Sequence, residues 1–131
     1  MYVRGGTAML TEKKQSLMLV INPTAGKNQA RDNLFPLTNY FFTHNYHVTV
    51  FPTQAKGDAC NYVAEYATQY DALVCVGGDG TLNEVVTGLM MCPADKRPRL
   101  GYIPGGSTNA RHQQRHGGSC RTVLLRQTVL L

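Results

Sequence analysis

The sequence lacks several features that would assign it to a class at once. It has no apolar run long enough to cross a bilayer, and residues 1–14 lack the apolar core of a signal peptide. Its four cysteines are far apart and none forms a Cys-x-x-Cys pair, which argues against a disulfide framework. Together these absences favour a reducing, cytoplasmic compartment.

Acidic residues are missing from the end of the chain. The formal net charge is +5, yet residues 1–110 hold all eight acidic residues of the sequence. The excess positive charge therefore belongs to residues 111–131, which contain four arginines and no acid. Because the body of the chain has no basic stripe with interleaved aromatic residues, no nucleic-acid partner is expected.

Short apolar segments alternate with segments of helical spacing. Strands are predicted at residues 16–21, 47–51, 72–76 and 100–103, and the stretches after the first three have the spacing of amphipathic helices. This alternation predicts an α/β fold, a three-layer α/β/α arrangement with a mainly parallel sheet. Ligands of such sheets bind beyond the carboxyl ends of the strands, so the loops after the four strands should meet at one edge.

The most informative stretch is Gly-Gly-Asp-Gly-Thr at residues 77–81, between a buried strand and a helix. Unpaired N–H groups and the positive end of the dipole at a helix N-terminus suit a phosphate. Glycine permits positive φ angles and lets an anion approach the backbone closely. We therefore predict a nucleotide-phosphate site here. The apolar face expected on the helix comprises Leu82, Val85, Val86, Leu89 and Met90.

Two familiar phosphate-binding motifs do not fit the chain. A Walker A loop needs Gly-Lys followed by Ser or Thr, whereas Gly26 and Lys27 are followed by Asn28. A Rossmann fingerprint needs a third glycine where this chain has Asn83. A tight turn that uses glycine only for its geometry remains the structural alternative. It does not explain why Asp, Thr, Asn and Glu gather at the start of the helix.

Four loops resemble those of a known superfamily. Residues 77–85, Gly-Gly-Asp-Gly-Thr-Leu-Asn-Glu-Val, resemble the signature of diacylglycerol and sphingosine kinases, and the first five are shared with NAD kinases. Asn-Pro-Thr-Ala-Gly-Lys at residues 22–27 resembles the first nucleotide loop of the lipid kinases. Thr53 with residues 57–59 resembles the second, and residues 104–109 resemble the fourth. The resemblance implies a nucleotide-binding domain similar to that of bacterial diacylglycerol kinase.

The same resemblance implies ATP and Mg²⁺ as cofactors and a diacylglycerol-like lipid hydroxyl as the phosphate acceptor. Backbone N–H groups and hydroxyls would donate to phosphate oxygens, and Mg²⁺ would neutralise the remaining charge. Asp79 would either orient the metal shell or accept backbone N–H bonds within the turn. Peripheral membrane contact and a homodimer stay open. The implied nucleotide contacts are Asn22, Pro23, Thr24, Ala25, Gly26, Thr53, Gly78, Asp79, Gly80, Thr81, Leu82, Asn83, Glu84 and Ser107.

The resemblance ends after Asn109, where the family continues with aspartate and then Phe-Ala-Arg, but this chain has Ala-Arg-His. We therefore expect a loose leader at residues 1–15, a nucleotide-binding domain at residues 16–109 and an atypical tail at residues 110–131. The family's second domain, a β-sandwich that supplies the general base and the lipid pocket, has no counterpart in the sequence. A truncated or frame-shifted chain that binds ATP but is nearly inactive as a kinase would explain this.

Two other functions remain open. An NAD kinase shares the glycine turn, although the loops at residues 22–27 and 104–109 favour the lipid group. A non-catalytic nucleotide-binding or interaction domain would fit if the chain is naturally this short. No catalytic or metal-ligating residue is assigned: His112 and His116 have helical spacing but lack a third ligand.

Overall fold

The structure, a computed structural model, describes residues 13–105 of the chain. In this part four strands form one sheet: β1 (Gln15–Ile21), β2 (Tyr46–Pro52), β3 (Ala72–Gly77) and β4 (Arg99–Pro104). Neighbouring strands are parallel throughout, and their order across the sheet is β2-β1-β3-β4. The predicted parallel sheet is confirmed.

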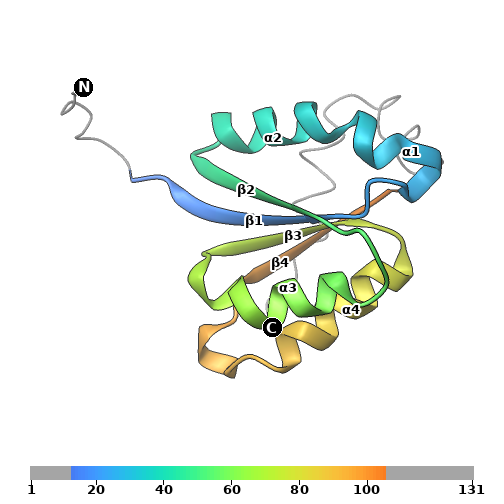
Figure 1. The fold of residues 1–131 in the computed structure, drawn as a ribbon. Coiled ribbons are helices and arrows are strands. Elements are labelled where there is room, and N and C mark those ends of the chain that lie inside the picture. Colours follow the sequence, from blue (N-terminus) through green and yellow to red (C-terminus); the bar gives the residue numbers. More distant parts are fainter. Residues whose placement is uncertain (1–12, 106–131) are drawn as a thin grey trace.

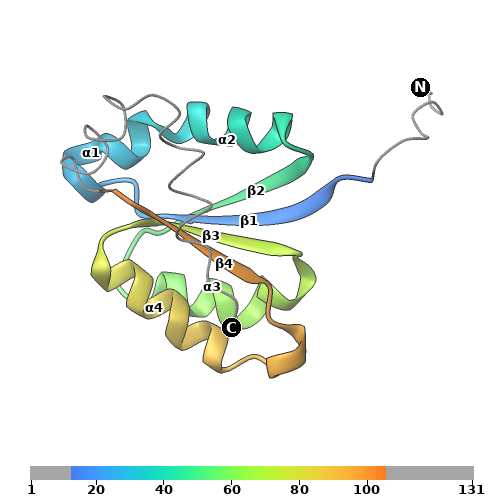
Figure 2. The same cartoon turned by 180° about the vertical axis from the view of Figure 1, so that it is seen from behind.

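Helices cover both faces of the sheet (Figures 1 and 2). On one face lie α1 (Ala25–Asp32) and α2 (Leu34–Thr43), and on the other lie α3 (Asp58–Tyr66) and α4 (Asp79–Met90). The short 3₁₀ helices η2 (Ala67–Gln69) and η3 (Ala94–Lys96) lead into β3 and β4. The three-layer α/β/α arrangement is therefore confirmed. Within the described residues, no helix has the length and apolar character needed to cross a membrane.

The two central strands are apolar on both faces, which is why they lie in the middle of the sheet. In β1 the side chains from Leu17 to Ile21 are buried, and in β3 every residue is buried. The edge strand β2 instead alternates: His47 and Thr49 are exposed, while Val48 and Val50 are partly buried against the α2 side. Hydropathy therefore separates the two central strands from the edge strand β2.

A proline divides the first helical segment. The sequence predicts a kink or a late helix start near Pro36, and the structure has two helices that meet at Asn33. Proline lacks an N–H, and its ring clashes with the carbonyl four residues earlier, so a helix cannot continue from Asp32 through Pro36. In the first turn of α2 the same residue is tolerated. Leu37 and Phe41 are buried against the sheet, as expected.

The prediction that Met90 lies on the buried face of α4 is wrong. Val85 and Leu89 are fully buried, but Met90 is 60% exposed. Gly88 is buried in its place, where α4 meets α3. A Cβ at Gly88 would lie 2.7 Å from the carbonyl oxygen of Cys60 in α3, so a residue without a side chain is needed there. The two helices thus approach backbone to backbone at Gly88, and the buried face of α4 is centred on Val85, Gly88 and Leu89.

Two tyrosines of α3 and one that follows η2 are partly buried against the apolar core on the α3 and α4 side of the sheet. The rings of Tyr62, Tyr66 and Tyr70 all pack against Phe51 of β2, with centroids 5.5, 5.4 and 6.1 Å away. They cover this core at the edge strand β2.

The switch point of the sheet lies between β1 and β3, where successive connections lead toward opposite edges of the sheet. Ligands of such folds bind at this crevice.

Candidate functional site

The loop after β1 is held by the side chain of Asn22. Its Oδ1 accepts hydrogen bonds from the backbone N–H of Thr24 at 3.2 Å and from the Thr24 hydroxyl at 3.0 Å. The backbone N–H of Asn22 donates to the carbonyl of Val76 in β3 at 2.9 Å, and Ala25 N–H donates back to the Asn22 carbonyl at 3.1 Å. Such a turn, closed by an Asn side chain, fixes the loop against the end of β3.

A strained turn follows this loop. Gly26 (φ 62°, ψ 38°), Lys27 (φ 56°, ψ 49°) and Asn28 (φ 74°, ψ 8°) all adopt left-handed backbone conformations. For residues with a Cβ this costs about 1–2 kcal/mol each, so two in succession are unusual. Strain of this kind persists only where its surroundings hold it, and it clusters at ligand-binding loops. The turn interrupts the first part of α1, after the loop that leaves β1, and Lys27 is exposed.

The glycine turn after β3 has no left-handed residue, contrary to one reason for expecting glycine there. Gly78 caps α4 with extended backbone (φ −91°, ψ −173°). Gly77 is required by packing, because a Cβ would lie 3.0 Å from both Cβ and Oγ1 of Thr81. At Gly78 and Gly80, by contrast, a Cβ would meet nothing within 4 Å. These two glycines leave open space over the backbone.

The start of α4 offers free donors beside that space. The first hydrogen bond at this end of the helix runs from the N–H of Leu82 to the carbonyl of Gly78 at 3.1 Å. The N–H groups of Asp79, Gly80 and Thr81 therefore have no partner inside the helix. Together with the positive end of the helix dipole, they form an arrangement that attracts an anion such as phosphate.

Asp58 closes the loop after β2. The sequence suggests it as the N-cap of α3, but Gly57, with a left-handed φ of 95°, holds the cap position, and Asp58 is the first helical residue. Its carboxylate accepts hydrogen bonds from the backbone N–H groups of Gln54 and Ala55 at 2.7 and 2.8 Å. The aspartate therefore shapes the second loop from the helix side.

Two hydrogen bonds tie the second loop to its neighbours. The backbone N–H of Thr53 donates to the carbonyl of Ile21, the last residue of β1, at 2.9 Å. The backbone N–H of Gly57 donates to Oε1 of Glu84 at 3.1 Å, in a partly buried position. Glu84 thus joins the second loop to the helix that follows the glycine turn, a positioning role that sequence reasoning did not foresee.

The end of β4 completes the edge. The N–H of Gly105 and the hydroxyl of Tyr102 both donate to the carbonyl of Gly77, at 2.9 and 3.1 Å. A Cβ at Gly105 would lie 2.8 Å from Cβ of Ala25 and 3.3 Å from Cα of Gly77. The start of α1 and the ends of β3 and β4 therefore touch at this point, and only glycine fits between them.

The hydroxyl of Tyr102 remains a neutral donor at ordinary pH. Burial raises its pKa above the usual value of 10.0, and the negative charge of Asp79 raises it further. The Asp79 carboxylate is exposed at the mouth of the glycine turn and has no hydrogen-bond partner among residues 13–105. Within the same residues, no three His, Cys, Asp or Glu side chains gather closely enough to hold a metal ion by themselves.

The structure brings the first three predicted loops together at one edge of the sheet, and Ser107 of the fourth lies outside the described residues. Gly105 and Tyr102, which pin the end of β4 to the glycine turn, were not among the predicted site residues. The bond from the Tyr102 hydroxyl in β4 to the Gly77 carbonyl in β3 depends on tertiary geometry, so no periodic pattern in the sequence indicates it. The predicted residues in these loops and the first turns of α4 are Asn22, Pro23, Thr24, Ala25, Gly26, Thr53, Gly78, Asp79, Gly80, Thr81, Leu82, Asn83 and Glu84. Of these, Leu82 is partly buried against the core.

Known proteins share this sequence pattern. Residues 16–123 match the family described as the diacylglycerol kinase catalytic domain. The chain is 39% identical over 92 residues to a diacylglycerol kinase of Bacillus subtilis (strain 168), covering 70% of this chain and 30% of that protein. It is 41% identical over 93 residues to a diacylglycerol kinase of Staphylococcus aureus (strain MRSA252), covering 70% of this chain and 29% of that protein. The matched region is thus less than a third of these relatives.

Solved structures share the fold as well. A diacylglycerol kinase from Bacillus anthracis str. Sterne superimposes with a TM-score of 0.63 at 29% sequence identity. The match covers 89% of this chain and 43% of that one. The chain therefore shares its fold with less than half of that larger protein.

Proposed function

Because the chain belongs to the diacylglycerol kinase catalytic domain family, we propose that it supplies the ATP-binding part of a lipid kinase. The kinase would transfer the γ-phosphoryl group of ATP to the hydroxyl of a diacylglycerol-like lipid, in peripheral contact with a membrane. The proposal rests above all on the open N-terminus of α4. There, free N–H groups and two glycines without neighbours face the crevice beside the strained first loop.

Phosphate would be bound mainly by the backbone. The N–H groups of Asp79, Gly80 and Thr81 point outward from the helix end and would donate to phosphate oxygens. The first loop would border the same site, with the hydroxyl of Thr24 oriented by the side chain of Asn22. Donors fixed in this way before the ligand arrives need no reorganisation, which is what phosphoryl transfer requires of a protein.

The residues at this edge also fit Mg²⁺, provided that phosphate shares the ion. Mg²⁺ prefers oxygen ligands and is usually held by one or two carboxylates together with substrate phosphates and water, not by a closed protein cage. Asp79 is an exposed carboxylate at the mouth of the turn and would be its protein ligand. When bound, the ion neutralises charge on the phosphates.

Phosphoryl transfer also needs an acceptor hydroxyl and a group that takes its proton. Two carboxylates near the crevice are engaged elsewhere: Glu84 accepts the N–H of Gly57, and Asp58 accepts two loop N–H groups. We therefore assign ATP binding, but not the general base, to the described residues. By themselves they should bind ATP with negligible turnover, and lipid phosphorylation well above background by this chain would refute that assignment.

Calorimetric titration of ATP with Mg²⁺ into the wild-type chain and Gly78→Ala tests the site. Wild type should bind in a saturable way. The variant should bind on the order of tenfold more weakly or worse, because a methyl group would occupy the space of a phosphate oxygen and disturb a charge-assisted hydrogen bond. Its thermal unfolding midpoint should stay close to wild type, because nothing lies within 4 Å of the new Cβ.

Thr87→Ala is the matched control, since this exposed residue lies near the far end of the same helix. It should leave ATP affinity unchanged. No heat of binding with wild type, or equal affinities for wild type and Gly78→Ala, would remove the basis of the proposal.

A further inference from the structure

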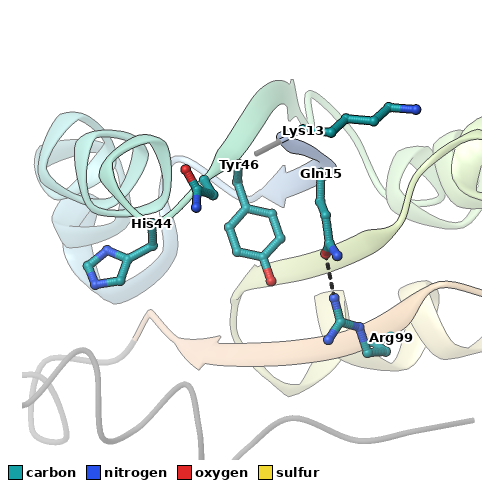
Figure 3. Close-up of a pocket in the computed structure, with 6 residues that line it drawn as sticks. Lys13, Gln15, His44, Tyr46 and Arg99 are labelled. Atoms are coloured by element: carbon teal, nitrogen blue, oxygen red, sulfur yellow. Dashed lines mark hydrogen bonds between the residues drawn. The ribbon is translucent and has the colours of Figure 1, made fainter. Parts of the chain in front are cut away.

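A second cluster of polar groups lies at the opposite edge of the sheet, where the strands begin. A pocket of about 490 Å³ opens there (Figure 3). Since β1 is seven residues long, this pocket is about 20 Å from the nucleotide loops at a rise of about 3.3 Å per residue. Its lining residues come from the starts of β1, β2 and β4 and from the turn before β2: Lys13, Gln15, His44, Asn45, Tyr46 and Arg99.

Arg99 is held in place across the sheet. Its Nη2 donates to Oε1 of Gln15 at 2.8 Å, reaching from the first residue of β4 past the start of β3 to the first residue of β1. This bond uses one of the five N–H donors of the guanidinium, and the others remain for a ligand. In Figure 3 the Tyr46 side chain extends toward the space beside this pair, His44 lies beyond Tyr46, and the Lys13 side chain extends away from the pair.

Positive charge prevails at this edge. Among residues 13–105, no carboxylate lines the pocket. The nearby acid Asp71, just before β3, is engaged by Ser16, whose backbone N–H and hydroxyl donate to its Oδ2 at 2.9 and 3.3 Å. The edge also carries Asp95 in η3. Against the described acids near this edge, Asp71, Asp95 and Glu65 in the last turn of α3, the described residues around the starts of β1 and β4 include five basic ones: Lys13, Lys14, Lys96, Arg97 and Arg99.

We propose that this pocket binds a phosphoryl group, with Arg99 as its main ligand, Tyr46 as a further donor and Lys13 as a positive charge at the rim. A guanidinium offers planar, paired N–H groups that match two phosphate oxygens, and one fixed by Gln15 loses little freedom on binding. A tyrosine hydroxyl adds a neutral donor and a lysine adds a point charge. The headgroup of an anionic lipid and a free phosphate monoester share this chemistry. The site is independent of the proposed ATP site, which lies at the other edge.

Nuclear magnetic resonance of the full 131-residue chain tests the pocket, with inorganic phosphate and glycerol 3-phosphate as soluble probes. Saturable shifts should appear at the backbone N–H groups of Gln15, Tyr46 and Arg99. Arg99→Gln should weaken binding about tenfold or more, the effect of losing a hydrogen bond to a charged group. The control Lys96→Gln removes the same charge from η3, outside the pocket, and should change affinity less than threefold.

Cosedimentation with phosphatidylcholine vesicles, with and without phosphatidic acid, separates the two sources of the group. Binding to glycerol 3-phosphate assigns the pocket to soluble monoesters, and Arg99-dependent binding only to phosphatidic acid vesicles assigns it to a headgroup. The proposal is overturned if no probe binds saturably, or if Arg99→Gln and Lys96→Gln weaken binding equally, since only diffuse charge would then act.

Two further variants keep the test decisive if Arg99→Gln fails to fold. Arg99→Lys keeps the charge but loses the planar, paired N–H groups of the guanidinium. Tyr46→Phe keeps the ring but loses the hydroxyl. Each should weaken binding severalfold while circular dichroism stays native, and unchanged affinity in both would contradict the proposal. ATP affinity should be the same in every one of these variants, so failure of this pocket and failure of the ATP site can be told apart.

Discussion

At the scale of single residues, the glycines around the crevice have two different roles. Gly77 makes room for the side chain of Thr81, and Gly105 makes room for Ala25 and Gly77. Gly78 and Gly80 have no such neighbour and leave the helix N-terminus open. A packing glycine and a ligand glycine look the same in a sequence. The distinction decides which substitution should damage the fold and which should damage only ligand binding.

Cys75 gives the fold a pH dependence in the alkaline range. The thiol is fully buried in β3, and burial raises its pKa from 9.0 to about 12. An unfolded chain ionises this thiol near pH 9, whereas the native state keeps its proton to higher pH. The contribution to stability is therefore complete below pH 9 and falls as the pH rises toward 12, by up to about 1.4 kcal/mol per pH unit.

Urea unfolding of wild type and Cys75→Ala at pH 8, 9.5 and 10.5 would measure this effect. At pH 8 we expect the variant to be less stable by about 1 kcal/mol, because packing is lost. Between pH 9.5 and 10.5 wild type should lose stability faster than the variant. The tyrosines titrate in both proteins, so parallel pH profiles would contradict the assignment to Cys75.

At the scale of elements, the contact of α3 with α4 depends on one position. A Cβ on Gly88 would lie 2.7 Å from the Cys60 carbonyl oxygen and 2.9 Å from Cβ of Val63. Because backbone cannot rotate away as a flexible side chain can, Gly88→Ala must push the helices apart. We expect a loss of about 1–3 kcal/mol in the free energy of unfolding, the usual cost of overpacking.

Denaturant unfolding of Gly88→Ala beside Thr87→Ala would measure this cost. Thr87 is the exposed neighbour on the same helix turn, so its variant should differ little from wild type. An alanine at position 88 that raised stability, as helix propensity alone would suggest, would show that the helices are not in backbone contact.

The bond from Gly57 to Glu84 couples the second loop to α4. Removing its acceptor in Glu84→Ala should free the Gly57 N–H and let the loop open more often. Glu84→Gln retains a side-chain oxygen that can accept the same bond. Hydrogen exchange at Gly57 should therefore accelerate severalfold in the alanine variant and stay near wild type in the glutamine variant. Equal acceleration in both would mean that the charge matters and the bond geometry does not.

At the scale of the whole molecule, periodicity predicted most of the architecture. Four apolar segments gave the four strands within one or two residues, and their alternation with helices gave the parallel sheet and the two covered faces. What failed was local. Met90 continues the apolar period of α4 but is displaced from the core by the close approach at Gly88, which depends on the partner helix and not on α4 itself.

The candidate site was predictable to the same extent as the fold: its position followed from the sequence, but its specific contacts did not. The rule that parallel strands end at one edge predicted that the loops after β1, β2 and β3 would meet, and they do. The bonds that hold them, from Gly57 to Glu84 and from Tyr102 to Gly77, join residues 27 and 25 positions apart. Contacts at such separation depend on tertiary geometry, so periodicity cannot predict them. The role of the predicted residues in nucleotide binding stays a prediction.

Ligand binding at the edge where the strands end should stabilise the domain as a whole. The first three loops are anchored to the ends of the three neighbouring strands β2, β1 and β3, so a nucleotide that bridges them binds only the folded state. ATP with Mg²⁺ at 100 times its Kd should then add about 2.7 kcal/mol to the free energy of unfolding. In thermal unfolding, ATP should raise the midpoint of wild type and of Arg99→Gln equally, and that of Gly78→Ala little.

NAD at the same concentration separates the rival kinase class, because a site that uses NAD as its acceptor would also be stabilised by NAD. A shift with NAD as large as that with ATP would therefore favour an NAD kinase over a lipid kinase.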